Sequence, residues 1–544
     1  MFILYTNLFY FQIEPFNPIF LYKNNLGMMG THDEETQDFF TDTNVECLLV
    51  SRENSDGVLT DAFVGTCYTH HQKTIICDTE YEEDNSLRRI IAFIGGLDIT
   101  NGRYDTPEFP LFKTCKTIHK GKDFYQNCAK GITEDTGPRQ PWHDIHAKVV
   151  GPIALDIMKN FEERWIKVSE ESKYKLFDIR HCDADFVIGV PAKIPEFEGR
   201  AWTVQLFRSI TSDSAKLCEE KTHILNQKGG RYVENSIQNC MIKQIRKAKH
   251  FIYIENQYFL GSAYAWLNDK ETLCDHLIPT ELVQKITEKI ACGESFKVYI
   301  VIPMFPEGDN PSDAATQEVL YWQYRTIEMM YGKIASAITE HNAGTHPKDY
   351  LMFFCLGKRE SNDEVPDNLI EPESGSLAES LRRSMRHSIY VHSKMSIFDD
   401  EYILVGSANI NQRCLAGERD TEIATGGYQP GHTVEEEVNP RGSVHTFRMA
   451  LWSAHFGGYN KSYLNPASEE CLAKVNEMSQ AFWELYIADE PEHSDCHALP
   501  YPLDIDKFGN IKPKPKPYDY FPDTNASVCG SKSYFPPFPE KVTT

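Results

Sequence analysis

The chain of 544 residues is short of positive charge, with 55 Lys and Arg residues against 79 Asp and Glu residues and a net charge of −24. Nucleic-acid binding depends on Lys and Arg side chains that neutralise phosphates, so this balance predicts no nucleic-acid partner. It also argues against simple electrostatic docking on an anionic membrane, unless a cation such as calcium bridges the two surfaces.

Paired cysteine motifs and long apolar runs are missing as well. The 15 cysteines contain no C-x-x-C pair, which argues against a disulfide framework and favours reduced thiols in a cytoplasmic protein. No run reaches the ~18 apolar residues that a membrane-spanning helix needs, so no transmembrane segment is predicted. The N-terminus lacks an early basic residue and a small-residue cleavage site, and therefore matches a secretory signal poorly.

One unusual pattern occurs twice. The stretch YVHSKMSIFDD places a histidine, a lysine and an aspartate in the spacing H-x-K-x-x-x-x-D, and YTHHQKTIICD repeats that spacing far upstream. The residues are His71, Lys73 and Asp78 in the first copy and His392, Lys394 and Asp399 in the second. Side chains two apart on a strand share a face, so the histidine and lysine of each copy should point the same way. A repeated pattern of this kind predicts that both copies meet at one site.

The flanks of the two copies also match. Each motif strand is followed by an apolar strand and a small-residue turn, Gly95-Gly96-Leu97-Asp98 in one copy and Gly406-Ser407-Ala408-Asn409 in the other. This internal repeat predicts two similar halves around a pseudo-two-fold axis. The alternation of helical and strand-like segments between the motifs predicts an α/β fold with a largely buried mixed sheet.

Two histidines and two lysines suit cleavage of a phosphodiester. One imidazole can attack phosphorus and form a phosphohistidine, while the other protonates the leaving oxygen and later activates water. The lysines supply fixed positive charge for the phosphoryl oxygens, so the chemical step itself needs no divalent metal. A carboxylate beside each imidazole would fix its tautomer, and by position Asp105 and Glu422 are the candidates.

Other polar residues allow two interpretations each. Asn256 and Gln257 end a strand-like segment and could bind phosphate or a headgroup, or serve a turn. His143 and His146 have a spacing that can converge on a metal or form a packed structural pair. A basic cluster could bind phosphoinositides or form the solvated face of a helix. Its members are Arg246, Lys247 and Lys249.

Several phrases resemble the catalytic region of plant C2-type phospholipase D, in particular its beta/gamma subgroup. They include GTHDEET, YTHHQKTIICD, FIGGLD, GRYDTPE, PRQPWHDIH, IYIENQYFLGS, YVHSKM and DDEYILVGSANINQR, and the resemblance runs from about residue 27 to residue 544. It implies two similar halves, each a mixed β-sheet flanked by helices, around one shared active site. The expected divisions are a divergent segment 1–26, halves at 27–235 and 236–470, and a C-terminal helix with a Pro-rich tail at 471–544.

The resemblance implies an activity and a set of residues. Phosphatidylcholine and related phospholipids would be hydrolysed to phosphatidic acid and a free headgroup, with transfer to primary alcohols as a side reaction. The six motif residues would be the catalytic set, with His71 as nucleophile and His392 as acid/base. Gln257 would contact substrate, and His143 and Glu422 would correspond to positions associated with calcium. The protein would be cytoplasmic and would bind peripherally to a phospholipid membrane with calcium as its cofactor, and phosphoinositides are a further expected partner.

This chain departs from the family pattern in three places. Nothing in it resembles the N-terminal C2 domain, residues 1–26 replace the segment that precedes GTHDEET in relatives, and Phe109 stands where relatives have a histidine. A phenyl ring cannot replace imidazole as a metal ligand. The first two departures suggest a truncated product or an incorrect gene model. The alternative functions are therefore an impaired lipid-binding or scaffold protein and another phosphodiester-cleaving or phosphatidyl-transferring enzyme. A nuclease is disfavoured by the acidic charge.

Overall fold

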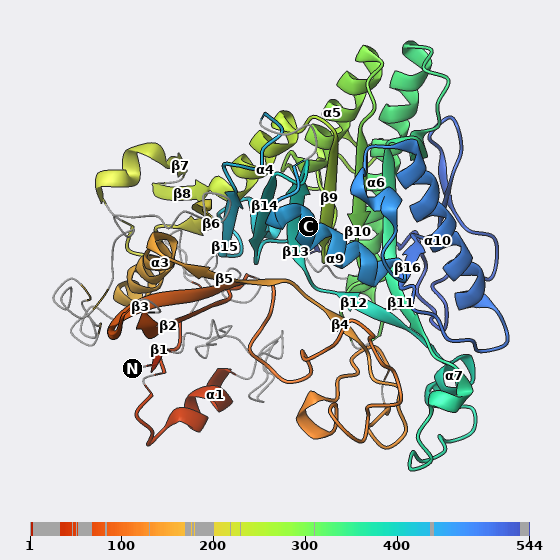
Figure 1. Ribbon diagram of the computed structural model, residues 1–544, viewed down its shortest axis with the longest axis horizontal. Helices are drawn as coiled ribbons and strands as arrows, with labels where there is room; N and C mark the ends of the chain where they lie inside the picture. The colour runs from red at the N-terminus through yellow and green to blue at the C-terminus, as the bar shows by residue number, and fades with distance from the viewer. Residues whose placement is uncertain are drawn as a thin grey trace.

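The computed structural model describes residues 2–3, 33–45, 47–50, 52, 68–81, 84–129, 131–168, 176, 179, 186, 201–217, 219–228, 230–308, 310–435, 440–533 and 543–544. The expected divergent segment 1–26 lies outside these residues, except for Phe2–Ile3. Within the described residues the chain forms two main sheets, a two-stranded sheet and several long helices (Figure 1).

A small antiparallel sheet comes from the first half of the chain. Its strands in spatial order are β1 (Phe2–Ile3), β2 (Thr74–Tyr81), β3 (Asp84–Gly95) and β5 (His146–Val150). Helix α3 (Pro152–Val168) buries Ile157 and Phe161 in a cluster with Ile76 and Ile94 of this sheet. The first motif therefore leads directly into a hairpin that one amphipathic helix covers.

A large mixed sheet forms the centre of the molecule. Its strands in spatial order are β4 (Trp142–His143), β12 (Arg386–Val391), β11 (Leu351–Arg359), β10 (Lys297–Val301), β9 (Phe251–Asn256), β13 (Lys394–Phe398), β14 (Tyr402–Gly406), β15 (Glu422–Tyr428), β6 (Thr203–Thr211), β8 (Arg231–Asn235) and β7 (Asn226–Lys228), with β16 (Ala498–Pro500) paired to β11. Strands β9, β10 and β11 run parallel, and β13, β14 and β15 continue the sheet as antiparallel neighbours.

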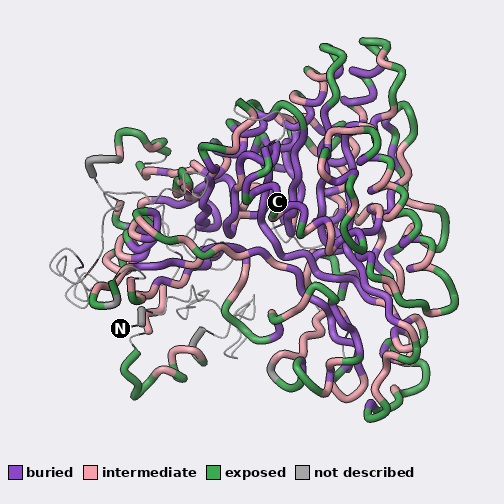
Figure 2. The backbone as a smooth tube through the Cα atoms, in the orientation of Figure 1, coloured by how far each residue is buried: buried purple, intermediate pink, exposed green. Residues whose placement is uncertain are grey.

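Helices cover both faces of this large sheet. They are α4 (Ser236–Lys247), α5 (Ile278–Cys292) and α6 (Ala314–Glu340) on one face, and α9 (Ser443–His455) with the start of α10 (Glu469–Ile487) on the other. Successive strand residues point to opposite faces, so Ile252 and Ile254 join the α4–α6 cluster while Phe251 and Tyr253 join the α9 cluster. Burial on both faces explains why the central strands are apolar throughout, as the purple core of Figure 2 shows.

The remaining elements are short and lie outside this frame. They are α1 (Asp33–Phe40), α7 (Leu377–Ser384), α8 (Gln412–Leu415), β17 (Leu503–Ile505) and β18 (Ile511–Pro513). No helix in the described ranges combines the length and the apolar character required to cross a bilayer.

The predicted α/β class, with its buried mixed sheet, is confirmed. The boundary expected at residue 235 does not separate the two sheets, because β6, β7 and β8 precede it and yet pair in the large sheet beside β15. Backbone hydrogen bonds between β6 and β15 thus join the two halves in one sheet. The internal repeat alone does not predict this pairing.

Candidate active site

The two motif histidines are held in the same way by backbone from the opposite half of the chain. The amide of His71, just before β2, donates to the carbonyl of Thr421 at 2.9 Å. The amide of His392, between β12 and β13, donates to the carbonyl of His143 at 2.7 Å. Each histidine therefore lies against the residue that precedes an acidic side chain of the other half, and the two motifs share one site as predicted.

The small-residue turns complete this symmetry. The amide of Gly96 donates to the carbonyl of Ile145 at 3.0 Å, and the amide of Ser407 donates to the carbonyl of Ile423 at 2.9 Å. A Cβ atom at Gly96 would lie 2.3 Å from Oδ1 of Asp144, so glycine is required there for the acid to approach the turn. The predicted equivalence of the two turns is confirmed by these matching contacts.

A carboxylate binds Nδ1 of each motif histidine. His71 Nδ1 lies 2.9 Å from Oε1 of Glu422, and His392 Nδ1 lies 2.7 Å from Oδ2 of Asp144. The prediction for Glu422 is confirmed. The prediction for Asp105 is wrong, because its Oδ2 accepts hydrogen bonds from the Arg139 guanidinium and the Trp142 amide, both at 2.8 Å. With Nδ1 occupied, Nε2 is the ring atom that can react.

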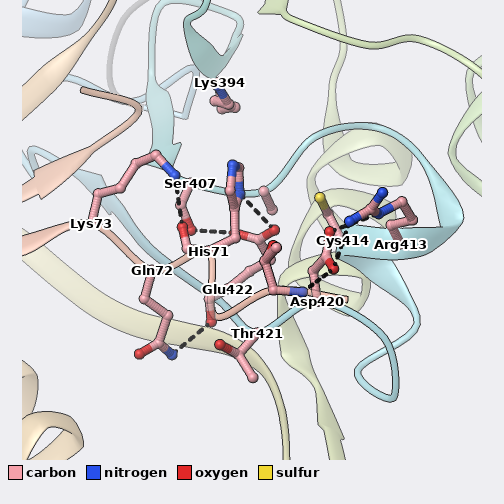
Figure 3. A network of polar contacts seen from close by, with 12 residues as sticks. His71, Gln72, Lys73, Lys394, Ser407, Arg413, Cys414, Asp420, Thr421 and Glu422 are labelled. Carbon is pink, nitrogen blue, oxygen red and sulfur yellow. Dashed lines mark hydrogen bonds and ion pairs between the residues drawn. The ribbon is translucent and has the colours of Figure 1, made fainter. Parts of the chain in front are cut away.

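The two motif lysines face the same space. Each ammonium group donates to the carbonyl of its own motif histidine, Lys73 to His71 at 3.0 Å and Lys394 to His392 at 2.6 Å. Only 4% of Lys73 and 3% of Lys394 is exposed. Figure 3 shows both lysines beside the His71–Glu422 pair. Two buried ammonium groups that face one space are suited to bind an anionic group, and Asp98 already lies 3.1 Å from the Lys73 ammonium.

Burial shifts the proton affinities in this site. Burial lowers the pKa of His71 and of His392 well below the ordinary value, and the neighbouring lysines lower it further. Burial also raises the pKa of Asp144 to about 7 and that of Glu422 to about 8. The pKa values of the two carboxylates are similar and do not by themselves give the two pairs different roles.

Burial likewise lowers the pKa of Lys394 to about 8, although Asp144 opposes that shift. The site thus holds several groups that titrate near neutral pH, a feature typical of functional sites.

The motif aspartates lie apart from the imidazoles. Asp399 accepts three backbone hydrogen bonds of 2.6–2.8 Å from residues 249–251, at the turn into β9. Asp78 pairs with Arg88 across the β2–β3 hairpin. The structure therefore brings together the two histidines and the two lysines of the expected catalytic set. It places the two aspartates away from them, where each stabilises the backbone or side chains of neighbouring strands.

Gln257 and an aromatic wall border the second histidine. Gln257 donates to the Tyr390 hydroxyl at 2.7 Å, and its buried Oε1 has no hydrogen-bond partner among the described residues. The rings of Trp142 and His392 lie 4.8 Å apart, and the Arg103 guanidinium lies 3.7 Å from the Trp142 ring centroid. Asn256 instead accepts backbone hydrogen bonds and serves the local turn.

The two residues expected at a calcium site lie in different groups. His143 Nε2 lies 2.6 Å from Glu255, which also binds His455 at 2.9 Å, whereas Glu422 groups with His71 and Cys414. His146 joins neither group; it belongs to β5 of the small sheet. Calcium takes six to eight oxygen ligands, and each group offers one carboxylate with imidazole or thiol. These residues therefore do not fit calcium.

Two residues of the site were missed by sequence reasoning. Asp144 lies in WHDIH beside the histidines that drew attention there, and Ser407 donates to the Glu422 carboxylate. The sequence did hold a signal for Asp144. Asp144 and Glu422 each precede an isoleucine, and the carbonyl of that isoleucine accepts a hydrogen bond from one of the two equivalent turns. That signal depends on knowing which strands pair.

Comparison with known proteins gives a consistent result. The family model for phospholipase D matches residues 19–530. Phospholipase D alpha 1 of Ricinus communis is 45% identical over 530 residues, covering 94% of this chain and 64% of the relative. Phospholipase D beta 1 of Arabidopsis thaliana is 43% identical over 531 residues, covering 94% of this chain and 48% of the relative.

Among solved structures, a phospholipase D family member, Nuc from Salmonella typhimurium, is 15% identical. That likeness covers 42% of this chain and 84% of Nuc, with a TM-score of 0.19.

The fold and the site define an α/β protein with two repeated halves that share one paired His–Lys centre. The chain belongs to the phospholipase D family. It spans less than two thirds of the length of the alpha-type and beta-type relatives it matches. The expected beta/gamma subgroup is not supported, because the alpha-type relatives match at least as strongly.

Proposed function

We propose that this protein is a phospholipase D, which hydrolyses phosphatidylcholine and related glycerophospholipids to phosphatidic acid and the free headgroup. The observation that carries the proposal is the single buried site in which both His–carboxylate pairs and both motif lysines meet. Curated phospholipase D relatives at about 45% identity support it.

The first chemical step transfers the phosphatidyl group to the protein. The lone pair on Nε2 of His71 forms a bond to phosphorus, and the bond from phosphorus to the headgroup oxygen breaks. The proton on Nε2 of His392 passes to that oxygen, so choline leaves with a neutral hydroxyl group and not as an alkoxide. Lys73 and Lys394 stabilise the charge on the phosphoryl oxygens. Glu422 and Asp144 hold the two rings by Nδ1.

The second step returns the enzyme to its starting state. His392 Nε2 takes a proton from water, the water oxygen bonds to phosphorus, and the phosphorus–Nε2 bond of His71 breaks. Phosphatidic acid is released, and both rings regain their initial protonation. A primary alcohol in place of water gives a phosphatidyl alcohol by the same route. Gln257, with an unused buried acceptor beside the aromatic wall, is proposed to contact the substrate.

We also propose that the protein is cytoplasmic and binds phospholipid surfaces peripherally, as its substrate would require. The protein has a net charge of −24. A calcium ion would therefore act by bridging acidic groups on the protein surface to lipid phosphates, and not by binding His143 or Glu422. A phosphoinositide would have to compete with existing ion pairs, because Arg246 pairs with Glu281 and Lys247 pairs with Glu401.

The alternative, an impaired lipid-binding or scaffold protein, is less favoured because both motifs are intact and meet. The test is release of choline from phosphatidylcholine vesicles, with formation of phosphatidylbutanol in butanol as the second readout. We expect His71→Ala and His392→Ala each to abolish both products, and the exposed His341→Ala to retain them. A folded protein that releases no choline, with or without calcium, would support the scaffold function.

A further inference from the structure

The two histidines must carry opposite proton states for the proposed reaction. His71 needs a lone pair on Nε2, and His392 needs a proton on Nε2, yet their surroundings are almost the same. Each ring has a buried carboxylate on Nδ1, an amide donated to the opposite half and a lysine two residues further along the chain. Some other group must distinguish the two rings. The following inference rests on the proposed function.

A third carboxylate breaks this symmetry. Asp98, in the turn after β3, lies with Oδ2 3.9 Å from Nε2 of His392 and with Oδ1 3.1 Å from the Lys73 ammonium. Its side chain is 20% exposed, so it lies between the buried lysine and the outer part of the site. The Asp98 carboxylate thus faces Nε2 of His392, whereas Asp144 contacts Nδ1 on the opposite side of the ring.

The other half has no such charge at the equivalent position. Gly96 and Ser407 occupy the same place in the two turns, as their amide hydrogen bonds show. Two residues further along, the first turn has Asp98 and the second has Asn409. Asn409 is 4% exposed, carries no charge, and has a buried Oδ1 without a hydrogen-bond partner among the described residues.

We propose that Asp98 is a positioning residue that keeps the proton on Nε2 of His392, and that it thereby makes His392 the acid and His71 the nucleophile. A carboxylate close to an imidazole nitrogen favours the protonated ring. The same carboxylate opposes binding of an anionic phosphodiester and occupies one donor of Lys73. Asp98 therefore lowers the affinity for the substrate and fixes the direction of proton transfer.

The test uses Asp98→Asn and two phosphatidyl substrates that differ in their leaving group. Choline is a poor leaving group that needs a proton, whereas p-nitrophenol leaves as a stable anion without one. We expect kcat for phosphatidylcholine to fall by about 10²-fold, the lower range of general acid catalysis. We expect kcat for phosphatidyl-p-nitrophenol to fall less than about fivefold, and KM to fall for both substrates because a negative charge is removed.

The variant is suited to this comparison. Asparagine has the shape of aspartate, and the repeat already has asparagine at the equivalent position, Asn409. Asp156→Asn, on the exposed face of α3, is the matched control and should change neither substrate's kinetics.

An equal loss of kcat for both substrates would overturn the inference, because loss of Lys73 positioning alone would not discriminate between leaving groups. Unchanged kcat for phosphatidylcholine would overturn it as well. If the wild-type protein turned over neither substrate, the proposed function itself would fail, which is a distinguishable result.

Discussion

Each motif histidine is paired with a carboxylate from the opposite half of the chain. Glu422 holds Nδ1 of His71 and Asp144 holds Nδ1 of His392, at 2.9 and 2.7 Å. Burial opposes charge on either partner, which is why the pKa of each imidazole is lowered and that of each carboxylate is raised. We therefore expect each pair to titrate as a unit, as closely coupled groups do.

Replacing a carboxylate by its amide should impair catalysis without unfolding the protein. We expect Glu422→Gln to lower kcat by about 10²–10⁴-fold, because an amide can hold the His71 ring but cannot stabilise its charged form. Steady-state choline release measures the effect. Glu418→Gln, which alters partly exposed ion pairs with Lys228 and Arg231, is the control. Unchanged turnover in Glu422→Gln would show that the pair is not needed.

Binding of an anion to the site should depend on the charge of Lys394. Burial lowers its pKa to about 8, so the ammonium is charged below that pH and neutral above it. Affinity for inorganic phosphate, measured by calorimetry, should therefore weaken as pH rises through about 8. Lys394→Arg should keep its affinity to higher pH, because guanidinium stays protonated. An affinity that does not change between pH 7 and pH 9 would contradict this role.

At the scale of elements, the reactive groups lie just outside the strands. His71 and Lys73 precede β2, and His392 lies between β12 and β13. The prediction that the motif histidine and lysine lie within a strand is wrong for these residues, because each histidine amide bonds to the opposite half and not to its hairpin partner. Strand ends allow side chains from two sheets to converge.

Asp399 holds one of these ends in place. It accepts three backbone hydrogen bonds at the turn between α4 and β9, which neighbours β13. We expect Asp399→Asn to lower the free energy of unfolding by about 2–4 kcal/mol, from the loss of charge-assisted hydrogen bonds to one buried and two partly buried amides. The turnover of the fraction that remains folded should fall less than tenfold.

Urea unfolding and active-site titration together separate the two effects of that substitution. The exposed Asp489→Asn should leave stability unchanged. If Asp399→Asn abolished turnover at full stability, Asp399 would belong to the chemistry and not to the support of the strand.

At the scale of the whole molecule, acid should weaken the fold. Burial lowers the pKa of His276 and of His146 to about 4, and that of His497 to about 3. Each ring stays neutral in the folded protein while the unfolded chain binds a proton below the ordinary pKa of about 6.5. Stability is therefore full above pH 6.5 and is lost as pH falls toward 4.

His276 alone should account for ~3 kcal/mol of this loss at pH 4, since its pKa is about 4 in the folded protein and about 6.5 in the unfolded chain. Urea midpoints at pH 7.5 and pH 4 measure the change. His276→Gln keeps a donor for the Leu260 carbonyl but does not titrate, so its midpoint should shift less with pH than that of the wild type. Equal shifts would rule out His276 as a source of acid sensitivity.

Much of the fold and the core of the site could be predicted from local patterns. The repeated spacing around His71 and His392, with the matching turns, predicts two halves that meet. Apolar runs such as FIYIEN indicate buried parallel strands, because a strand covered on both faces has no polar side. The pairing of β6 with β15, which joins the halves in one sheet, could not be predicted, since strand partners are set by contacts distant in sequence.

The amino-acid sequence by itself determined the residue types of the chemistry, two imidazoles and two ammonium groups, and the symmetry that brings them together. Only the tertiary structure decided which acids serve them: Asp144 and not Asp105, by an exchange of partners between halves. It also placed the Asp98 carboxylate 3.9 Å from Nε2 of His392. The physical reason is that hydrogen-bond partners depend on distance in space, which sequence spacing does not specify across separate strands.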